Sequence, residues 1–445
     1  MNPAVSAIPW RRSALPLLLA AFLAATFLAL GANSDVGRNF VTVGCGALAV
    51  AAVTVAGRYA TATISPPFLV LAFALPIQAV VQTIAALTGV VSDDFAPVAT
   101  LADASALYVA YALFLVAARL ALPTLGDVRT IVTALVTLGL LESAYGALNL
   151  LAGNEYLLVF KRLAYHDSAT GTLVNRNHFA YVLEMTIPLA VTTAIASLPA
   201  RYSGTIAAAE EKARAGIVMV AVAVMLLALL LSRSRMGLAS LVAAAVMMIG
   251  CERVLRPAGV SPSALAGRGA VAILVAITSV FVAGVGLDVA IERFSHASSD
   301  LEVGRLPIWR DSWPMALTHP LFGSGFGGYG ELIASYRDGP SGFSYGHAHS
   351  DYLETAIEGG IVAVLVVAAW MTFFVRRLVR ALRMTVSPER RMMIVAAATG
   401  ITSVALHSTL DFGLRIPAVA LTLLLLVAVF LRLTDGEEAR PVVRA

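Results

Sequence analysis

Charged residues are scarce in this 445-residue chain, where Asp, Glu, Lys and Arg together make up only 13% of the sequence. A soluble globular protein carries about 25% charged residues. Hydrophobic residues, in contrast, account for 59% of the chain. This balance excludes an ordinary soluble domain and indicates a polytopic membrane protein.

Cysteine is also nearly absent: Cys45 and Cys251 are the two in the chain, and each lies within or at the edge of an apolar run. Two such residues provide neither a disulfide framework nor a zinc site. The net charge of +4 does not indicate nucleic-acid binding, because the basic residues are spread between short loops. The segment from Trp10 to Leu30 has the outline of a signal peptide, but the many later spans favour a retained first helix.

Apolar runs long enough to cross a bilayer recur along the whole chain. We predict an all-α integral membrane protein that forms a single polytopic membrane domain over residues 1–445. The twelve predicted spans are at about residues 13–31, 36–56, 66–88, 97–121, 129–152, 177–198, 215–232, 235–251, 269–288, 356–375, 392–411 and 415–433.

Basic residues set the expected orientation of these spans. With the N-terminus inside, cytoplasmic segments hold 20 of the 31 Lys and Arg residues and outer segments hold 11. Because cytoplasmic loops are enriched in Lys and Arg, both termini are expected in the cytoplasm. All seven histidines fall on the outer half, at positions 166, 178, 296, 319, 347, 349 and 407. We therefore expect the outer face to be the functional one.

The longest outer segment runs for about 65 residues, from Val289 to Leu353, between the ninth and tenth spans. Loops of this length in compact proteins are usually functional. Within it, residues 304–318 predict a short amphipathic helix with Arg305, Trp309 and Trp313 at i, i+4 and i+8. Arg305 either reaches the lipid headgroups or binds a diphosphate, since a guanidinium matches phosphate oxygens in pairs.

The segment Ser344–Ala363 brings polar residues directly against an apolar run. Ionisable groups at a membrane helix are expensive and usually functional. If a helix begins at Asp351, then Asp351, Glu354 and Glu358 share one face and His349 stands at its entrance. The alternative is a polar cap followed by solvated charges. A metal pair of His347 and His349 is disfavoured, because alternate residues share a face only on a strand.

Three further motifs carry polar groups on the outer side. Ser232–Gly237 holds Arg233 and Arg235, which are costly there unless paired or bound to an anion. Gly171–Tyr181 holds Asn175 and Asn177, which either bind substrate or cap the following helix. A span ends at His407 with an aspartate four residues later, Asp411.

A glycine-rich stretch, Thr318–Gly330, matches the G-x-G-x-x-G pattern. A dinucleotide site requires a preceding strand and a following helix, so this match is rejected as a nucleotide site. Tight turns that bring the backbone close to a ligand remain an alternative. A Ser-His-Asp hydrolase is disfavoured because the chain has no G-x-S-x-G nucleophile elbow.

Taken together, these motifs resemble the O-antigen ligase family of bacterial envelope glycan ligases and polymerases. The resemblance covers mainly residues 171–430. It is carried by GTLVNRNHFA at 171–180, SRSRMG at 232–237, Arg305 with Trp309, HPLFGSGFG at 319–327, HSDYLETAIEGG at 349–360 and HSTLDF at 407–412. Family members usually have Asn after the catalytic histidine, whereas this chain has Ser350.

The resemblance implies a GT-C-like membrane fold with a large periplasmic loop, here residues 289–355, that carries part of the active site. It implies transfer of a glycan from undecaprenyl diphosphate to a hydroxyl of a glycan or of lipid A-core, at the periplasmic face of the inner membrane. No cofactor or metal is implied. The catalytic residues would be His349, Arg235 and Arg305. The expected substrate-binding residues are Arg233, Asn175, Asn177, Glu354, Glu358, Asp351 and His319.

The carboxylates of Asp351, Glu354 and Glu358 are expected to orient His349 or the acceptor. Two alternatives stay open at this point. One is a polymerase of the same family, which differs in its acceptor. The other is a transporter or flippase for a lipid-linked sugar, which is disfavoured because transporters usually hold ionisable groups near the bilayer midplane, within repeats.

Overall fold

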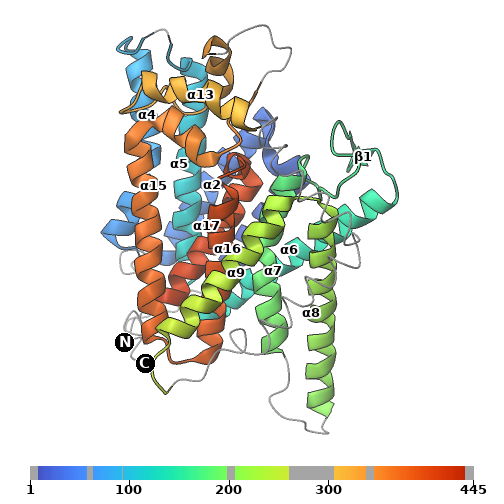
Figure 1. Cartoon of the computed structure of the whole chain (residues 1–445). Helices are drawn as coiled ribbons and strands as arrows, with labels where there is room; N and C mark the ends of the chain where they lie inside the picture. The colour runs from blue at the N-terminus through green and yellow to red at the C-terminus, as the bar shows by residue number, and fades with distance from the viewer. Residues whose placement is uncertain are drawn as a thin grey trace.

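The protein is a bundle of long helices, as the computed structural model in Figure 1 shows. The structure describes residues 9–57, 64–92, 94–197, 206–259, 305–336 and 345–435. The one sheet in this part of the chain is a hairpin of β1 (Tyr156–Leu157) and β2 (Phe160–Lys161). The helices are α1 (Pro9–Leu28), α2 (Asp35–Ala56), α4 (Pro66–Leu87), α5 (Val98–Leu120), α6 (Leu125–Leu151), α7 (Arg176–Ala196), α8 (Ile206–Leu231), α9 (Arg235–Leu255), α13 (Leu306–Thr318), α14 (Tyr329–Leu332), α15 (Asp351–Met384), α16 (Pro388–His407) and α17 (Pro417–Thr434). The all-α membrane fold predicted from composition is confirmed.

Eleven of the twelve predicted spans coincide with one of these helices, and the ninth, 269–288, lies outside the described residues. Among the helices described, eight are long and apolar enough to cross a membrane. α1 and α8 add the shorter apolar stretches Ala14–Leu28 and Ala215–Leu231. The total of twelve spans therefore stays a prediction.

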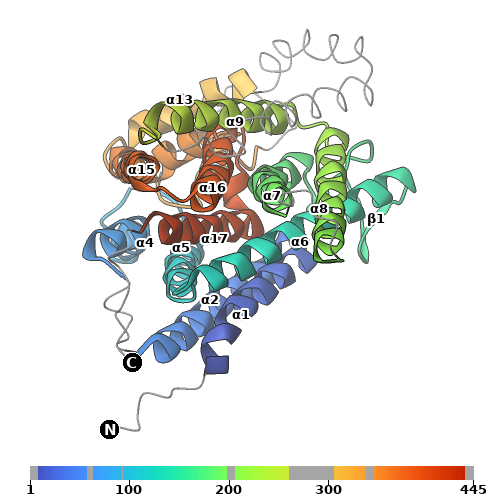
Figure 2. The ribbon, with the colours of Figure 1, turned by 90° about the horizontal axis from the view of Figure 1, so that it is seen from below.

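The centre of the bundle is formed by α7, α16 and α17. Of the 18 residues in the most apolar stretch of each helix, 83% are buried in α7 and 72% in α17, against 22% in α2. Figure 2 shows α17 near the middle, with α5 and α6 on one side and α15 and α16 on the other. A helix surrounded in this way is apolar on all sides, so its few polar residues must find partners inside the protein.

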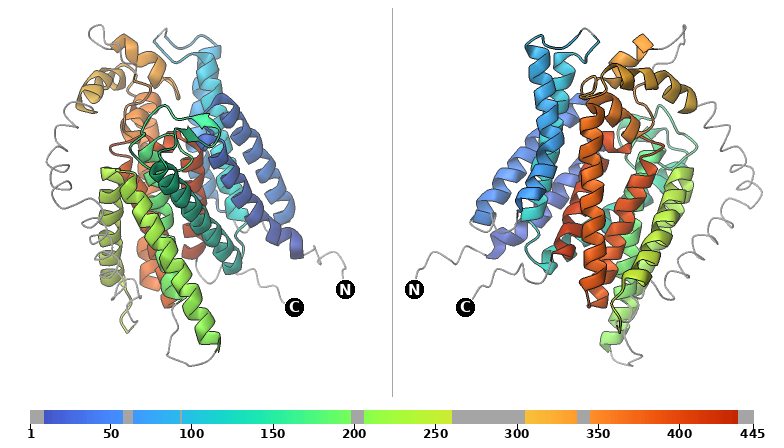
Figure 3. Two further views of the ribbon diagram at one scale, coloured as in Figure 1. Left: turned by 90° about the vertical axis from the view of Figure 1, so that its right-hand side faces the viewer. Right: turned by 60° about the vertical axis from the view of Figure 1, so that its left-hand side comes forward.

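The connections predicted to be outer gather at one end of the bundle. There, Ala96 N–H donates to Ser324 O (2.8 Å), and the Asp351 amide donates to Asp411 O (2.9 Å). Both views in Figure 3 show α13 at this end. At the other end the side chains of Arg119 and Arg377 both bind the carboxylate of Asp435. Among the described helices, these contacts join connections that are predicted to lie on the same side of the membrane.

Helix α15 is broken at Gly360, whose φ of 62° lies in the left-handed region. The glycine-rich segment packs into this break: a Cβ on Gly323 would lie 2.2 Å from the carbonyl carbon of Glu358. Two side chains of α4 satisfy the freed carbonyls, because Gln78 Nε2 donates to Gly359 O (2.6 Å) and Gln82 Nε2 donates to Glu358 O (2.9 Å). The glycines therefore bring the backbone close to α15, and this contact fixes the first turns of that helix.

Candidate functional site

His349 immediately precedes the cap of α15 and has a φ of 49°, an uncommon backbone conformation for a residue with a side chain. The backbone of the preceding residue, Ala348, is held by hydrogen bonds at both its N–H and its carbonyl. Ala348 N–H donates to Glu354 Oε2 (2.9 Å), and the indole N–H of Trp309 donates to Ala348 O (2.9 Å). Strained backbone persists only where its surroundings determine it, and such positions cluster at functional sites. The predicted helix at residues 304–318 thus contributes directly to the geometry of His349.

The predicted acidic face exists, and Arg415 lies in its centre. Arg415 Nε is 3.3 Å from Glu354 Oε1 and 4.0 Å from Asp351 Oδ1, while Nη1 is 2.5 Å from Glu358 Oε2. All three carboxylates are at least 95% buried. A buried carboxylate requires a partner, and the guanidinium supplies it. Solvated charges, the simpler alternative, do not describe this face.

Phe412 brings three histidines together. Its ring stacks on His347, with centroids 4.1 Å apart, and meets His349 and His178 edge-on, each at 4.9 Å. His347 Nδ1 also lies 3.0 Å from Glu354 Oε1. His347 is therefore part of the same cluster as His349 rather than a residue that only lines the loop.

Asp411 connects this cluster to α13 and α7. Its buried carboxylate accepts a hydrogen bond from the side-chain amide of Asn177 and lies 3.8 Å from Arg305 Nη2. Burial lowers the pKa of His349, Asp411 opposes that effect, and Arg305 adds to it. The lowered pKa favours a neutral imidazole, which is the form that can accept a proton.

The two arginines of Ser232–Gly237 have different surroundings. Arg233 is exposed, has a φ of 56°, and its Nη1 forms an ion pair with Asp167 Oδ2 (2.5 Å). Arg235 is half-buried and is the first residue of α9, where Ser234 Oγ caps the helix by accepting from Gly237 N–H (3.2 Å). The second arginine thus stands on a rigid element at the same end of the bundle as His349.

The asparagines at the start of α7 divide between the two expected roles. Asn175 caps the helix, since its Oδ1 accepts from Asn177 N–H (2.8 Å). Asn177 instead donates to Asp411. Between them, the guanidinium carbon of Arg176 lies 5.5 Å from the centre of the Tyr165 ring. The sequence motif therefore combines a structural cap with a residue of the cluster.

His319 lies apart from the histidines around Phe412. Its Nε2 is 3.1 Å from Asp94 Oδ2, and its ring meets Phe95 edge-on at 5.8 Å. Both contacts are with the connection between α4 and α5. The recorded contacts of His319 thus attach the end of α13 to that connection.

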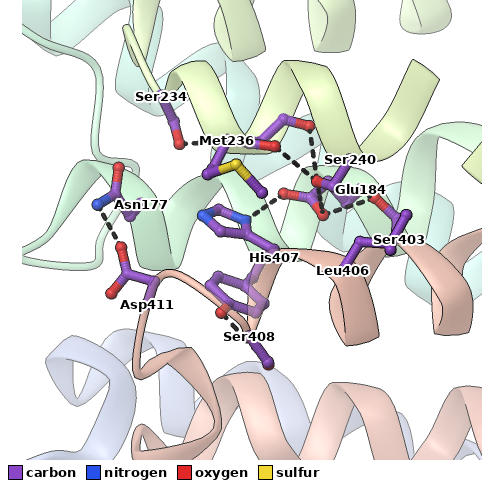
Figure 4. A network of polar contacts seen from close by, with 12 residues as sticks. Asn177, Glu184, Ser234, Met236, Ser240, Ser403, Leu406, His407, Ser408 and Asp411 are labelled. Atoms are coloured by element: carbon purple, nitrogen blue, oxygen red, sulfur yellow. Dashed lines mark hydrogen bonds and ion pairs between the residues drawn. The ribbon is translucent and has the colours of Figure 1, made fainter. Parts of the chain in front are cut away.

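His407 contacts the core of the bundle. Its Nδ1 lies 2.6 Å from Glu184 Oε1, and its ring stacks on Tyr181 at 4.1 Å (Figure 4). Four residues later the chain reaches Asp411, so one turn separates the buried pair from the cluster around Phe412. Within the described ranges, no group of three or more His, Cys, Asp or Glu residues is arranged to hold a metal ion.

The sequence predicts His349 at the entrance of α15 and Arg305 on the short helix at residues 304–318, but it does not predict the residues that support them. Arg415 is one of the 11 basic residues of the outer segments, and Phe412 belongs to the motif HSTLDF at 407–412. The one local signal of Arg415 is its place in an outer segment, where the positive-inside bias disfavours basic residues. The roles of Trp309 and Glu184 depend on contacts between distant segments and have no local signal.

The arrangement brings a half-buried histidine with a lowered pKa and several arginines to one end of the helix bundle. A sequence model of the family described as O-antigen ligase matches residues 220–368, about one third of the chain. The matched segment includes Arg233, Arg235, Arg305 and His349. No curated protein matches this sequence. The match agrees with the resemblance in the motifs and supports an O-antigen ligase or polymerase-like family, with a membrane function of that type, for this chain.

Proposed function

We propose that this protein is a glycosyltransferase that moves a glycan from undecaprenyl diphosphate to an acceptor hydroxyl at the periplasmic face of the inner membrane. His349 is the general base, and Arg235 and Arg305 bind the diphosphate. The proposal rests on the O-antigen ligase match and on the motifs that it includes. The lipid-linked donor would reach the site from the surrounding membrane lipid, and the acceptor would be a glycan or lipid A-core.

The observation that carries the proposal is the fixed position of His349 in a cluster that also holds Arg305, which contacts Asp411. The peptide before His349 is held by Glu354 and Trp309, and Asp411 lies 3.8 Å from Arg305 Nη2. A sugar hydroxyl is a poor nucleophile near neutral pH, so a positioned base accelerates its attack by about 10²–10⁴-fold. Burial lowers the pKa of His349 and so favours its basic form.

The arginines would stabilise the departing diphosphate. Negative charge grows on the leaving oxygen as the glycosidic bond breaks, and preorganised cations in a site with little water stabilise that charge. Guanidinium groups bind phosphate oxygens in pairs, which an ammonium group cannot do. Attack by the acceptor from the opposite side inverts the anomeric centre. This chemistry requires no metal ion.

Transfer by the purified protein from a lipid-linked donor to an acceptor glycan tests the proposal. Arg235→Lys and Arg305→Lys are expected to lower donor affinity and transfer rate together, because the diphosphate is charged before and during reaction. Arg310→Lys, on an exposed site of α13, is the matched control. Full activity of both lysine variants would contradict the proposal. So would activity abolished by a chelator and restored by one divalent ion.

The ligase and the polymerase of this family differ in the acceptor. Surface glycans of a deletion strain distinguish them. Loss of polymer from lipid A-core, with polymer still made, is the outcome expected for a ligase. A single repeat unit on lipid A-core would instead assign the polymerase reaction.

A further inference from the structure

Glu184 lies inside α7 and is fully buried. Its carboxylate is bound from two other helices, as Figure 4 shows. Ser240 of α9 donates to Oε2 (3.0 Å), and Ser403 of α16 donates to the same oxygen (2.6 Å). The second oxygen, Oε1, lies 2.6 Å from Nδ1 of His407, the last residue of α16. One side chain therefore joins three helices.

A carboxylate in the interior of a membrane protein is expensive, and such residues are usually functional. Here the hydrogen-bonding partners compensate for burial, and removing one partner leaves a buried polar group unsatisfied. An apolar side chain would fill this position at lower cost. The carboxylate therefore has a task that packing alone does not provide.

The three helices carry residues of the candidate site. α9 begins at Arg235, five residues before Ser240, which is about 7.5 Å along a helix. α16 ends at His407, four residues before Asp411. α7 begins beside Asn177, whose side chain binds Asp411. The residues that bind Glu184, and Glu184 itself, are thus one to two helical turns along the chain from Arg235, Asp411 and Asn177.

A second observation shows how closely the first turn of α9 approaches α7. A Cβ on Gly237 would lie 2.6 Å from Ala180 Cβ and 3.1 Å from Glu184 Oε1. This glycine is two residues from Arg235 and also donates its N–H to Ser234 Oγ (3.2 Å). The start of α9 therefore lies directly on α7, and a shift of α9 away from Glu184 would move Arg235.

We propose that Glu184 is a positioning residue for Arg235: its bonds to Ser240, Ser403 and His407 hold the start of α9 where the guanidinium meets the donor diphosphate. This inference rests on the proposed function. Glu184 does not touch the reacting atoms. Its effect is on donor binding through Arg235, and it leaves the proton transfer at His349 in place.

Ser240→Ala is the mild test, because it removes one hydroxyl and leaves the packing intact. The expected result is an increase of about tenfold in the KM for a lipid-linked donor, which corresponds to one hydrogen bond to a charged group. The rate of transfer should fall as well, as it does when Arg235 itself is changed. Ser143→Ala is the matched control. Both hydroxyls are buried and lie 2.6 Å from the carbonyl four residues earlier, that of Gly139 or Met236, but the recorded bonds of Ser143 do not reach Glu184.

A double-mutant cycle with Arg235→Ala separates positioning from a general loss of stability. Ser240→Ala and Glu184→Gln are each measured alone and combined with Arg235→Ala, with donor affinity and the unfolding temperature as readouts. If Glu184 acts through Arg235, neither change weakens donor binding further once Arg235 is absent. Additive losses in the combined variants, or wild-type donor affinity in Ser240→Ala, would overturn the inference.

The same cycle distinguishes failure of this inference from failure of the proposed function. If Arg235→Ala binds donor and transfers glycan like the wild type, the proposed function fails first. If Arg235→Ala loses donor binding while Ser240→Ala and Glu184→Gln act additively with it, only the positioning role fails. Glu184→Gln keeps the size of the side chain, and Ser240→Ala provides the result if that variant does not fold.

Discussion

His349 combines a strained backbone, partial burial and a neighbouring guanidinium. Its φ of 49° is held by contacts that Ala348 makes with Glu354 and Trp309. The environment thus fixes the direction of the imidazole before any substrate binds. A base held in this way loses little entropy on reaching the transition state.

The first prediction concerns the loss of that base. His349→Ala is expected to slow transfer by about 10²–10⁴-fold, the usual contribution of a positioned base, while donor affinity stays close to that of the wild type. The measurement is single-turnover transfer together with separate donor binding. His166→Ala, at an exposed position on the same end of the bundle, is the control. Loss of donor binding in His349→Ala would make this residue a ligand rather than a base.

His347, two residues from His349, is not suitable as a control for that substitution. It stacks on Phe412 and contacts Glu354, whose other oxygen holds the Ala348 peptide. We therefore expect His347→Ala to reduce activity by loosening the support of His349. An inactive His347→Ala beside an active His349→Ala would reverse the assignment of the base.

The second prediction concerns pH. Burial and Arg305 lower the pKa of His349 from its usual 6.5. The neutral base therefore persists to lower pH than in a free histidine, and kcat/KM should fall only below pH 6.5. Arg305→Gln removes one lowering contribution, and the acidic limb of the pH profile is expected to move to higher pH. Arg310→Gln, exposed on α13, should leave the limb where it is. If the acidic limb of the pH profile stayed unchanged in Arg305→Gln, Arg305 would not be a cause of the lowered pKa of His349.

The helices that carry the site were largely predictable, and the way they meet was not. Hydropathy and amphipathic spacing predicted α13 and the start of α15 within a few residues. The acidic face followed from i, i+3, i+7 spacing, but its partner Arg415 comes from a segment more than fifty residues later. Local patterns carry information about faces; the partner of a face depends on tertiary packing.

The break in α15 illustrates the same limit. Both glycine pairs belong to motifs of the family resemblance, Gly359 and Gly360 in 349–360 and Gly323 and Gly325 in 319–327, and the second stretch also predicts tight turns close to a ligand. In the structure the two segments pack against each other, and a Cβ on Gly360 would lie 2.5 Å from the carbonyl carbon of Leu321. Nothing in either segment alone indicates the other, because close approach of two backbones leaves only small residues as its signature.

The third prediction tests that contact. Gly323 has a φ of 75°, and a Cβ there would overlap the backbone of Glu358 at 2.2 Å. Gly323→Ala is expected to lower stability by about 1–3 kcal/mol through overpacking and to reduce transfer by displacing the first turns of α15. Gly46→Ala, which would meet nothing within 4 Å, is the control. Equal unfolding temperatures for the two variants in detergent would contradict the packing role.

The distribution of charge over the described residues bears on the choice between a transferase and a transporter. His178, His347, His349, Arg235, Arg305 and Arg415 all lie at the end of the bundle where α7, α9 and α15 begin. A transporter requires a site that faces both sides in turn. Accessibility of single introduced cysteines, measured from each side, should find this end exposed to one side only. Access from both sides would favour transport.

The last prediction concerns orientation in the membrane. The outer connections of the sequence-based topology meet at the end of the bundle that holds His349, and the arginine-rich end of α15 lies opposite, where Arg377 binds Asp435. The segments predicted to be cytoplasmic hold 20 Lys and Arg residues and those predicted to be outer hold 11, so the positive-inside bias predicts that the site faces the periplasm. Reporter fusions after Arg383 should therefore score cytoplasmic, and fusions near Gly339 periplasmic. Undecaprenyl-linked glycans are used on the outer leaflet in the proposed reaction, so the reverse pattern at either position would remove the donor from the site and with it the proposed function.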